Sequence, residues 1–245
     1  MQQYGLIGYP LGHSFSKKYF TDKFEKEGLE DCFFELFALK NVQELPALLL
    51  THPSLCGLAV TIPYKESVLP FLHYIDVKAQ NIGAVNCIKI EAGILTGFNT
   101  DVLGFEKSFT RLLQPKHTKA LILGTGGASK AVQYILTNLK IPFVVVSRIA
   151  NKTKAIIAYS DITADIVNEF SIIINCSPVG MGSLSEDKPA IPYQFLNSNH
   201  YLYDLIYHPE ETLFLKEGKF RGATVKNGYE MLVEQAEENW KIWNS

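Results

Sequence analysis

The chain has 245 residues, of which 47% are hydrophobic and 20% are charged, and its formal net charge is -2 at pH 7. These values are typical of a globular protein with one large or two modest domains, and they exclude a disordered chain. The near-neutral charge, without a dense cluster of lysine and arginine, argues against a nucleic-acid partner. The N-terminus lacks a secretory signal, and no apolar run approaches the ~18 residues of a membrane span. We therefore expect a cytoplasmic protein without a membrane partner.

The four cysteines are scattered along the chain and show no shared motif. They lack the Cys-x-x-Cys and Cys/His spacings of zinc sites, and they do not suggest a disulfide framework. We therefore predict no metal site and four small, buried thiol side chains, at Cys32, Cys56, Cys87 and Cys176.

Strands and helices are expected to alternate along the first hundred residues. Apolar runs predict four strands, and the turn at Ala92-Gly93 predicts a hairpin that adds a fifth. The expected strands are residues 4–8, 32–39, 57–61, 84–91 and 94–98. Helical periodicity predicts three helices, the first of which ends before Gly28. The expected helices are residues 16–26, 42–50 and 64–72.

The second part of the chain is predicted to form a parallel sheet. A helix after Asp101 leads to Pro115, and four continuous apolar runs follow that suit strands covered on both faces. These runs are ALILG, FVVVS, SIIINCS and HYLYDLI, at residues 120–124, 143–147, 171–177 and 200–206. A last helix is expected at residues 228–243. The predicted fold class is therefore α/β, with an N-terminal α/β domain and a parallel-sheet domain.

A glycine-rich loop at residues 124–129, Gly-Thr-Gly-Gly-Ala-Ser, lies between a predicted strand and a helix at 129–139. Its first two glycines match the dinucleotide-binding fingerprint, and Ser129 stands at the third glycine position. Glycines let the backbone approach a pyrophosphate, whose charge is met by N–H groups at the helix N-terminus. Since a second strand follows, the context predicts a nucleotide-binding βαβ unit and a nicotinamide-dependent oxidoreductase.

The end of the second strand of this unit indicates which nicotinamide cofactor is used. Proteins that bind NAD carry Asp or Glu there to hold the ribose 2′-hydroxyl, whereas this chain has Ser147 and Arg148. A carboxylate would repel a 2′-phosphate, and a guanidinium binds it through charge-assisted hydrogen bonds. NADP is therefore predicted in preference to NAD.

Polar residues follow the predicted strands of the first domain. Ser14 and Ser16 precede or open a helix, where their hydroxyls can cap the helix or face a ligand, and both interpretations stay open. Lys65 comes just past another strand, and Asp101 stands at the junction of the two domains. A lone lysine is ordinarily a surface charge, so its meaning depends on its neighbours.

Eight ordered motifs resemble those of the shikimate dehydrogenases, enzymes of aromatic amino-acid biosynthesis, and the resemblance covers nearly the whole chain. The motifs are GYPLGHSFS, VTIPYK, AVN, FNTDVLG, GTGGASKA, INCSPVGM, YDLIYHPEET and GYEMLVEQA. The resemblance implies two α/β domains that flank a cleft. Residues 1–100 plus 223–245 would form the shikimate-binding and catalytic domain, and residues 101–222 a Rossmann-like NADP-binding domain.

The resemblance also implies roles for individual residues. The catalytic pair would be Lys65 and Asp101. The substrate would be bound by Ser14, Ser16, Thr61, Asn86, Tyr207 and Gln235. NADP would be bound by Gly124, Gly126, Gly127, Ala128, Ser147, Arg148 and Gly228. Periodicity alone would make Gln235 only a polar residue on a helix face.

The implied reaction is the reversible, NADP-dependent reduction of 3-dehydroshikimate to shikimate. Two assignments of the proton transfer stay open. Lys65 is the acid/base, or Asp101 relays the proton with Lys65 as its electrostatic partner. The expected partner is a small-molecule substrate, and the expected assembly is a monomer or homodimer.

One departure from the family pattern concerns the substrate side. The family usually has Asn two positions before the threonine of the lysine motif, where this chain has Ala59. This change removes one polar contact or scaffold. Two alternatives are a quinate/shikimate dehydrogenase of broader specificity and a catalytically silent metabolite-binding paralogue.

Overall fold

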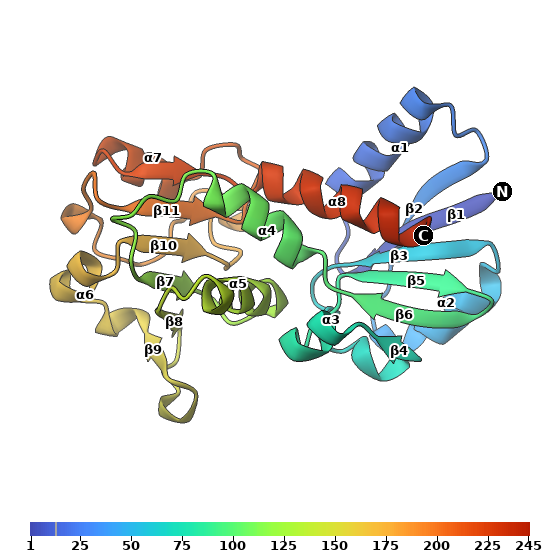
Figure 1. The fold of residues 1–245 in the computed structure, drawn as a ribbon, viewed down its shortest axis with the longest axis horizontal. Coiled ribbons are helices and arrows are strands. Elements are labelled where there is room, and N and C mark those ends of the chain that lie inside the picture. Colours follow the sequence, from blue (N-terminus) through green and yellow to red (C-terminus); the bar gives the residue numbers. More distant parts are fainter. Residues whose placement is uncertain (13) are drawn as a thin grey trace. The chain divides into compact units, whose positions relative to one another are not determined.

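The computed structural model describes residues 1–12 and 14–245, and His13 of the first motif lies outside the described residues. The described chain divides into two compact units. The first comprises Met1–Thr100 and Ala236–Ser245, and the second comprises Asp101–Gln235. Figure 1 shows the elements of both units with the labels used below.

The chain returns to the first unit at residue 236. The sequence predicts this return at residue 223. Residues 223–235 belong to the second unit because strand β12 (Thr224–Lys226) pairs with β11 (Tyr201–Asp204). The first turns of the last helix, α8 (Tyr229–Trp243), follow in the same unit. The functional roles of the two domains stay a prediction.

The first unit is built on a mixed six-stranded sheet in the order β2-β1-β3-β5-β6-β4. The strands are β1 (Gln2–Gly8), β2 (Cys32–Ala38), β3 (Leu55–Val60), β4 (Tyr74–Ile75), β5 (Cys87–Glu91) and β6 (Ile94–Phe98). Strands β2, β1 and β3 are parallel, whereas β5 is antiparallel to both β3 and β6. The helices are α1 (Phe15–Glu27), α2 (Leu45–Thr51) and α3 (Val77–Ile82).

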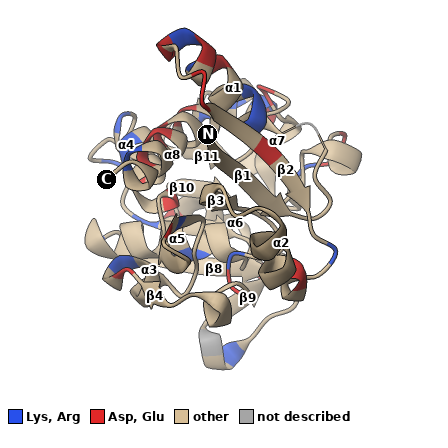
Figure 2. Cartoon of the chain, turned by 90° about the vertical axis from the view of Figure 1, so that its right-hand side faces the viewer, with Lys and Arg blue, Asp and Glu red and all other residues tan. Residues whose placement is uncertain are grey.

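Each face of the first sheet has its own core, because side chains alternate along a strand. In β1, Ile7 belongs to an aliphatic cluster, and Tyr4 belongs to an aromatic cluster on the opposite face. Helix α1 adds Phe20 and Phe24, four residues apart, to the aromatic cluster, and the end of α8 adds Trp243. Both basic and acidic residues occur along α1 (Figure 2).

Two local predictions for the first unit are corrected by the structure. The helix predicted at 64–72 is wrong, since turns lead only to a short 3-10 helix, Leu69–Phe71. Pro70 has no N–H to donate to an earlier carbonyl, so an α-helix cannot run through it. Helix α3 was not predicted, although Asp76 caps its start and Gly83 ends it in the left-handed conformation.

The second unit is built on a six-stranded sheet in the order β12-β11-β10-β7-β8-β9, in which every pair is parallel. The remaining strands are β7 (Ala120–Leu123), β8 (Phe143–Ser147), β9 (Ile156–Ala158) and β10 (Ile172–Asn175). The helices besides α8 are α4 (Asp101–Thr110), α5 (Gly127–Asn138), α6 (Ala164–Glu169) and α7 (Leu213–Phe220). This is the doubly wound nucleotide-binding order. The predicted α/β class with a parallel second sheet is confirmed.

Helices cover both faces of the parallel sheet, so its strands are apolar on both sides. Phe105 and Phe109 of α4 contact the rings of Tyr203 and Tyr201 on one face. On the other face, α6 and α7 pack on side chains such as Leu121. This coverage on both faces explains why the strands are uninterrupted apolar runs in the sequence.

No helix among the described residues is long and apolar enough to cross a membrane. In the same part of the chain, no group of three or more His, Cys, Asp or Glu side chains is arranged to hold a metal ion. All four cysteines are free thiols. The prediction that all four are buried holds for Cys87 only, because Cys32, Cys56 and Cys176 are partly exposed.

Candidate functional site

The predicted substrate residues of the first unit lie near one end of the strands of its sheet. Strands β1, β3 and β6 end on this side of the sheet, and the antiparallel β5 begins there. Ser14 follows β1 and Thr61 follows β3, while Asn86 directly precedes β5. The topology therefore gathers residues that are far apart in sequence.

The two serines take different positions at the start of α1. Ser14 has the extended backbone of an N-cap residue, but its side chain makes no capping hydrogen bond within the described residues. Ser16 is buried in the first turn of the helix. The capping interpretation of Ser14 is therefore wrong.

The segment that carries Thr61 and Lys65 is held on both sides. The Thr61 N–H donates to the Ile7 carbonyl at 3.0 Å, and the Tyr64 hydroxyl donates to the Leu39 carbonyl at 2.5 Å. The carbonyl of Lys65 accepts from the Val85 N–H at 2.7 Å. This backbone anchoring fixes where the half-buried Lys65 side chain starts.

Asn86 is buried and bonded on both sides of its amide to Thr100. Its Nδ2 donates to Thr100 Oγ1 at 2.9 Å, and its Oδ1 accepts from the Thr100 N–H at 2.7 Å. Thr100 belongs to the FNTDVLG motif but was given no role from the sequence. It sets the orientation of the Asn86 amide.

Ala59 is buried in the aromatic cluster together with Cys87 and Trp243. It pairs with Cys87 across strands β3 and β5. A carboxamide at this position would be buried among apolar side chains and would need a hydrogen-bonding partner there. The departure from the family pattern therefore replaces a polar group by apolar packing.

The glycine-rich loop lies at the switch point of the parallel sheet. Strand β7 lies between β8 and β10, so the chain crosses to opposite sides of the sheet from here, and ligands bind at such points beyond the carboxyl ends of the strands. Gly124 has φ +121°, and a Cβ there would lie 3.1 Å from the Cys176 backbone after β10. Only glycine fits this position.

Gly126 is not subject to such a steric limit. It caps α5, and a Cβ added there would meet no described atom within 4 Å. Its small size therefore serves no packing within the described protein and leaves the backbone N–H groups of the first turn accessible. Gly127 and Ala128 form that turn, whose N–H groups have no partners inside the helix. This geometry fits a pyrophosphate.

Ser129 is fully buried, and its hydroxyl accepts from Gln133 Nε2 at 3.1 Å. Helix α5 begins two residues earlier than predicted, so Ser129 lies inside the helix. The third fingerprint position therefore carries a small residue whose polar group is satisfied by the next turn.

Ser147 ends β8, and the exposed Arg148 follows it. Arg148 lies close enough to act on the Tyr159 phenol, whose pKa is raised chiefly by burial. The side chain of Tyr159 is hydrogen-bonded to Ser177 in the loop after β10. Arg148 and the glycine loop thus both follow the carboxyl ends of parallel strands. A cation at this position fits an added phosphate.

Asp101 and Gln235 both belong to the second unit. Asp101 is buried at the first position of α4, where a carboxylate is stabilised by the helix dipole. One turn later, a Cβ on Gly104 would lie 3.2 Å from the Gln235 backbone nitrogen. The close packing of α4 on α8 therefore brings the segments of Asp101 and Gln235 together.

Gly228 and Tyr207 lie beyond the end of β11. A Cβ at Gly228 would lie 2.1 Å from the Leu205 carbonyl oxygen, so this backbone contact alone requires glycine. The predicted cofactor contact of Gly228 stays a prediction. Tyr207 is half-buried in the loop that follows β11.

A buried carboxylate that the sequence did not single out supports the loop after β10. Asp204 accepts from Thr212 Oγ1 at 2.6 Å, from Asn175 Nδ2 at 3.0 Å and from the Ile206 N–H at 3.0 Å. Asn175 in turn accepts from the Ser177 hydroxyl at 2.7 Å. Burial raises the pKa of Asp204 to about 6, against the lowering effect of these donors.

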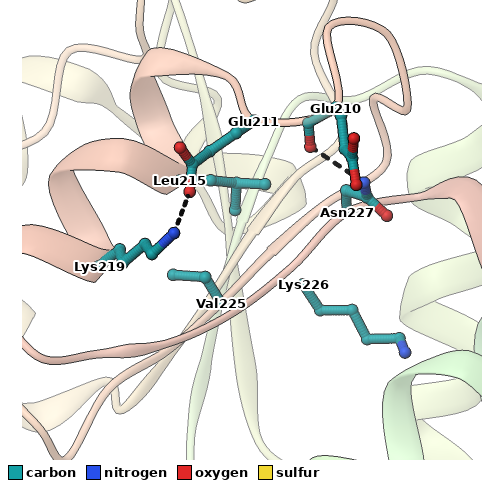
Figure 3. Close-up of a pocket in the computed structure, with 7 residues that line it drawn as sticks. All are labelled: Glu210, Glu211, Leu215, Lys219, Val225, Lys226 and Asn227. Carbon is teal, nitrogen blue, oxygen red and sulfur yellow. Dashed lines mark hydrogen bonds and ion pairs between the residues drawn. The ribbon is translucent and has the colours of Figure 1, made fainter.

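A hollow of about 390 Å³ lies elsewhere on the second unit (Figure 3). It is lined by Glu210, Glu211, Leu215, Lys219, Val225, Lys226 and Asn227. Glu211 pairs with Lys219 at 2.9 Å, and Asn227 Nδ2 donates to the Glu210 carbonyl at 2.9 Å. The hollow contains none of the predicted site residues, and its mixed charges favour no single ligand class.

The chain is similar to shikimate dehydrogenases along its whole length. Residues 6–88 match the family model of the shikimate dehydrogenase substrate binding domain. A shikimate dehydrogenase (NADP(+)) of Caldanaerobacter subterraneus subsp. tengcongensis is 35% identical over 98% of this chain and 90% of its own length.

Two solved structures share the fold of the chain. Shikimate 5-dehydrogenase from Thermus thermophilus, in complex with NADP(H) and shikimate, has a TM-score of 0.86 at 29% identity and covers 99% of this chain and 93% of its own. Quinate dehydrogenase from Corynebacterium glutamicum, in complex with NAD, has a TM-score of 0.86 at 25% identity with the same coverage. The similarity therefore includes both units.

Proposed function

The chain belongs to the shikimate dehydrogenase family, and from this premise we propose that it catalyses the reversible, NADP-dependent reduction of 3-dehydroshikimate to shikimate. The observation that carries the proposal is 35% identity to a shikimate dehydrogenase (NADP(+)) over 98% of the chain. The glycine loop at the switch point and the cation after β8 support it, because they fit a phosphorylated dinucleotide.

The proposed cofactor residues divide the binding of NADP between two strands. Gly124, Gly126, Gly127 and Ala128 would hold the pyrophosphate, while Ser147 and Arg148 would hold the 2′-phosphate. Gly228 is proposed to lie beside the same cofactor. NADP, when bound, supplies the hydride chemistry that amino-acid side chains lack.

The proposed substrate residues match the chemistry of a small ring with several hydroxyls and a carboxylate. Hydroxyls and amides recognise hydroxyl groups through paired donors and acceptors, and such sites reject analogues that lack them. The residues proposed for this role are Ser14, Ser16, Thr61, Asn86, Tyr207 and Gln235.

Lys65 and Asp101 are proposed to handle the proton. An ammonium at the reacting oxygen stabilises developing negative charge and can donate the proton, while a carboxylate can hold the ammonium or relay the proton. Both assignments need the two residues together. A small-molecule substrate, a cytoplasmic location and a monomer or homodimer complete the proposal.

An assay of absorbance at 340 nm tests the proposed function. The purified chain is incubated with shikimate or quinate and with NADP or NAD, in all four combinations. We expect the highest kcat/KM with shikimate and NADP. Equal or better turnover of quinate would indicate the broader quinate/shikimate dehydrogenase. No turnover with any pair would overturn the proposal in favour of a metabolite-binding paralogue.

A further inference from the structure

Three neutral polar side chains form a buried cluster in the first unit. Asn86 precedes β5, Thr100 follows β6, and Asn239 lies in α8. Their exposed fractions are only 3%, 2% and 1%, although each carries an amide or hydroxyl. Buried polar groups are costly unless they are hydrogen-bonded, so their arrangement must be well defined. Asn239 has no role in the sequence-based site.

The hydrogen bonds of the cluster have a direction. The Thr100 hydroxyl donates to Asn239 Oδ1 at 2.7 Å and accepts from Asn86 Nδ2 at 2.9 Å. A second acceptor for the same hydroxyl proton, Asn86 Oδ1, lies farther away at 3.2 Å. Because a hydroxyl has one proton, Asn239 draws that proton away from Asn86.

This direction decides how Thr100 uses the oxygen of Asn86. The Thr100 N–H already donates to Asn86 Oδ1 at 2.7 Å. If the Thr100 hydroxyl turned to the same oxygen, Thr100 would engage both acceptor lone pairs of Asn86. With Asn239 in place, Thr100 engages one of them. Thr100 therefore holds the amide in one orientation and does not itself exhaust the acceptor capacity of its oxygen.

We propose that Asn239 is a positioning residue for substrate binding, which orients the Asn86 amide through the Thr100 hydroxyl. This inference rests on the proposed function, in which Asn86 binds a hydroxyl of the substrate. Asn239 touches neither substrate nor cofactor in this scheme. Its effect on the substrate passes through two hydrogen bonds of a buried chain.

Helix α8 holds Asn239 firmly enough for this role. Ala236 and Trp243 lie three residues before and four residues after Asn239, on the same helical face, and both pack in the aromatic cluster. Trp243 Nε1 donates to the Ile88 carbonyl at 3.0 Å, and Glu237 pairs with Lys23 at 3.0 Å. The helix is thus anchored on both sides of Asn239.

The first experiment compares Asn239→Ala with Asn239→Asp by steady-state kinetics. Asn239→Ala is expected to raise KM for shikimate roughly tenfold, the effect of one lost buried hydrogen bond, with KM for NADP within about twofold of wild type. Asn239→Asp keeps an acceptor at the same position and should restore KM for shikimate. Asn244→Ala is the matched control, because Asn244 is exposed at the end of the same helix.

Thr100→Val by itself keeps the proposal falsifiable if Asn239→Ala folds poorly, because loss of the shared hydroxyl should also raise KM for shikimate. Where Asn239→Ala folds, a double-mutant cycle tests whether its effect passes through Thr100. Thr100→Val removes the shared hydroxyl, so the double variant Thr100→Val/Asn239→Ala should raise KM no further than Thr100→Val alone. Additive effects, an unchanged KM in Asn239→Ala, or an equal loss in Asn239→Asp would overturn the proposal. Absence of turnover in the wild type would instead overturn the proposed function.

Discussion

The two units bury different kinds of polar side chain around sheets of equal strand number. In the described residues of the first unit, the buried polar side chains other than Tyr4, Tyr64 and Cys87 are neutral amides and hydroxyls: Gln3, Ser16, Asn86, Asn99, Thr100 and Asn239. The second unit buries carboxylates and imidazoles as well, namely Asp101, His117, His200 and Asp204 among its described residues. A neutral cluster orients groups at any pH, whereas a buried group with a shifted pKa, such as Asp204 or His117, couples folding to protons.

The apolar cores of the two units also differ in which segments of the chain build them. The aromatic cluster of the first unit is completed by the last residues of the chain, through Trp243. On the α6 and α7 face of the second sheet, the core is mainly aliphatic and is made by successive βα segments. The first unit therefore depends on a distant segment, and the second on local crossovers. Variants in either unit therefore test this difference.

The largest effect is expected from Lys65→Met in the first unit. Removing a group that transfers or stabilises a proton in the transition state should lower kcat by roughly 10²–10⁴-fold. KM for NADP should change little, because the proposed cofactor residues lie in the second unit. Steady-state kinetics with shikimate and NADP measure both values. A normal kcat with a raised KM for shikimate would contradict both proton-transfer assignments.

The next largest effect concerns the stability of the first unit. Trp243→Ala should lower its free energy of unfolding by about 3–5 kcal/mol, because a large buried ring is lost. The chain has two tryptophans, and the remaining Trp240 reports the same aromatic cluster by fluorescence during urea denaturation. Trp243→Phe, which keeps a ring but not the N–H donor, should lose less. A loss below about 1 kcal/mol in Trp243→Ala would show that the distant segment is dispensable.

Asp204 should make the stability of the second unit depend on pH. Its pKa is raised to about 6, above the ~3.9 of an unfolded Asp, so the native state binds this proton more tightly. The linked stabilisation is present below about pH 4 and is lost as pH rises through 6, by ~3 kcal/mol in total.

The measurement is the stability of wild type relative to Asp204→Asn, by urea denaturation followed with far-UV circular dichroism between pH 4 and pH 7. Wild type should lose stability relative to the variant as pH rises. Subtraction removes the opposite effect of His117, whose pKa burial lowers to about 4. The control is Asn239→Ala in the neutral cluster, whose stability difference should stay constant over this range. A flat difference for Asp204→Asn would remove the contrast between the two units.

The smallest effect is expected from Arg148→Ala in the second unit. Loss of a charge-assisted hydrogen bond to the 2′-phosphate should raise KM for NADP roughly 10–100-fold and leave KM for shikimate unchanged. Lys140→Ala removes an exposed cation at the opposite end of β8 and serves as the control. An equal rise in KM for NAD would argue against recognition of the 2′-phosphate.

Most of the fold could be predicted from the sequence, because most of its strands and helices follow from the pattern of neighbouring residues. The uninterrupted apolar runs predicted the parallel strands, and the loop from Gly124 to Ser129 predicted the start of α5 within two residues. The helix expected at 64–72 failed because a single proline overrides helical periodicity. Helix α3 was missed although its caps, Asp76 and Gly83, are readable signals.

The sequence by itself determined the family, the α/β class, the glycine loop and the candidate residues, since each depends on residue types at short spacing. Only the tertiary structure decided which buried polar groups orient these candidate residues. Residues 86, 100 and 239 meet because the start of β5, the end of β6 and the last helix converge, and no local sequence pattern predicts this contact. The same holds for Asp204, whose raised pKa follows from burial, and for Gly228, which backbone packing against Leu205 requires. Long-range packing sets burial, and burial sets the strength and direction of these hydrogen bonds.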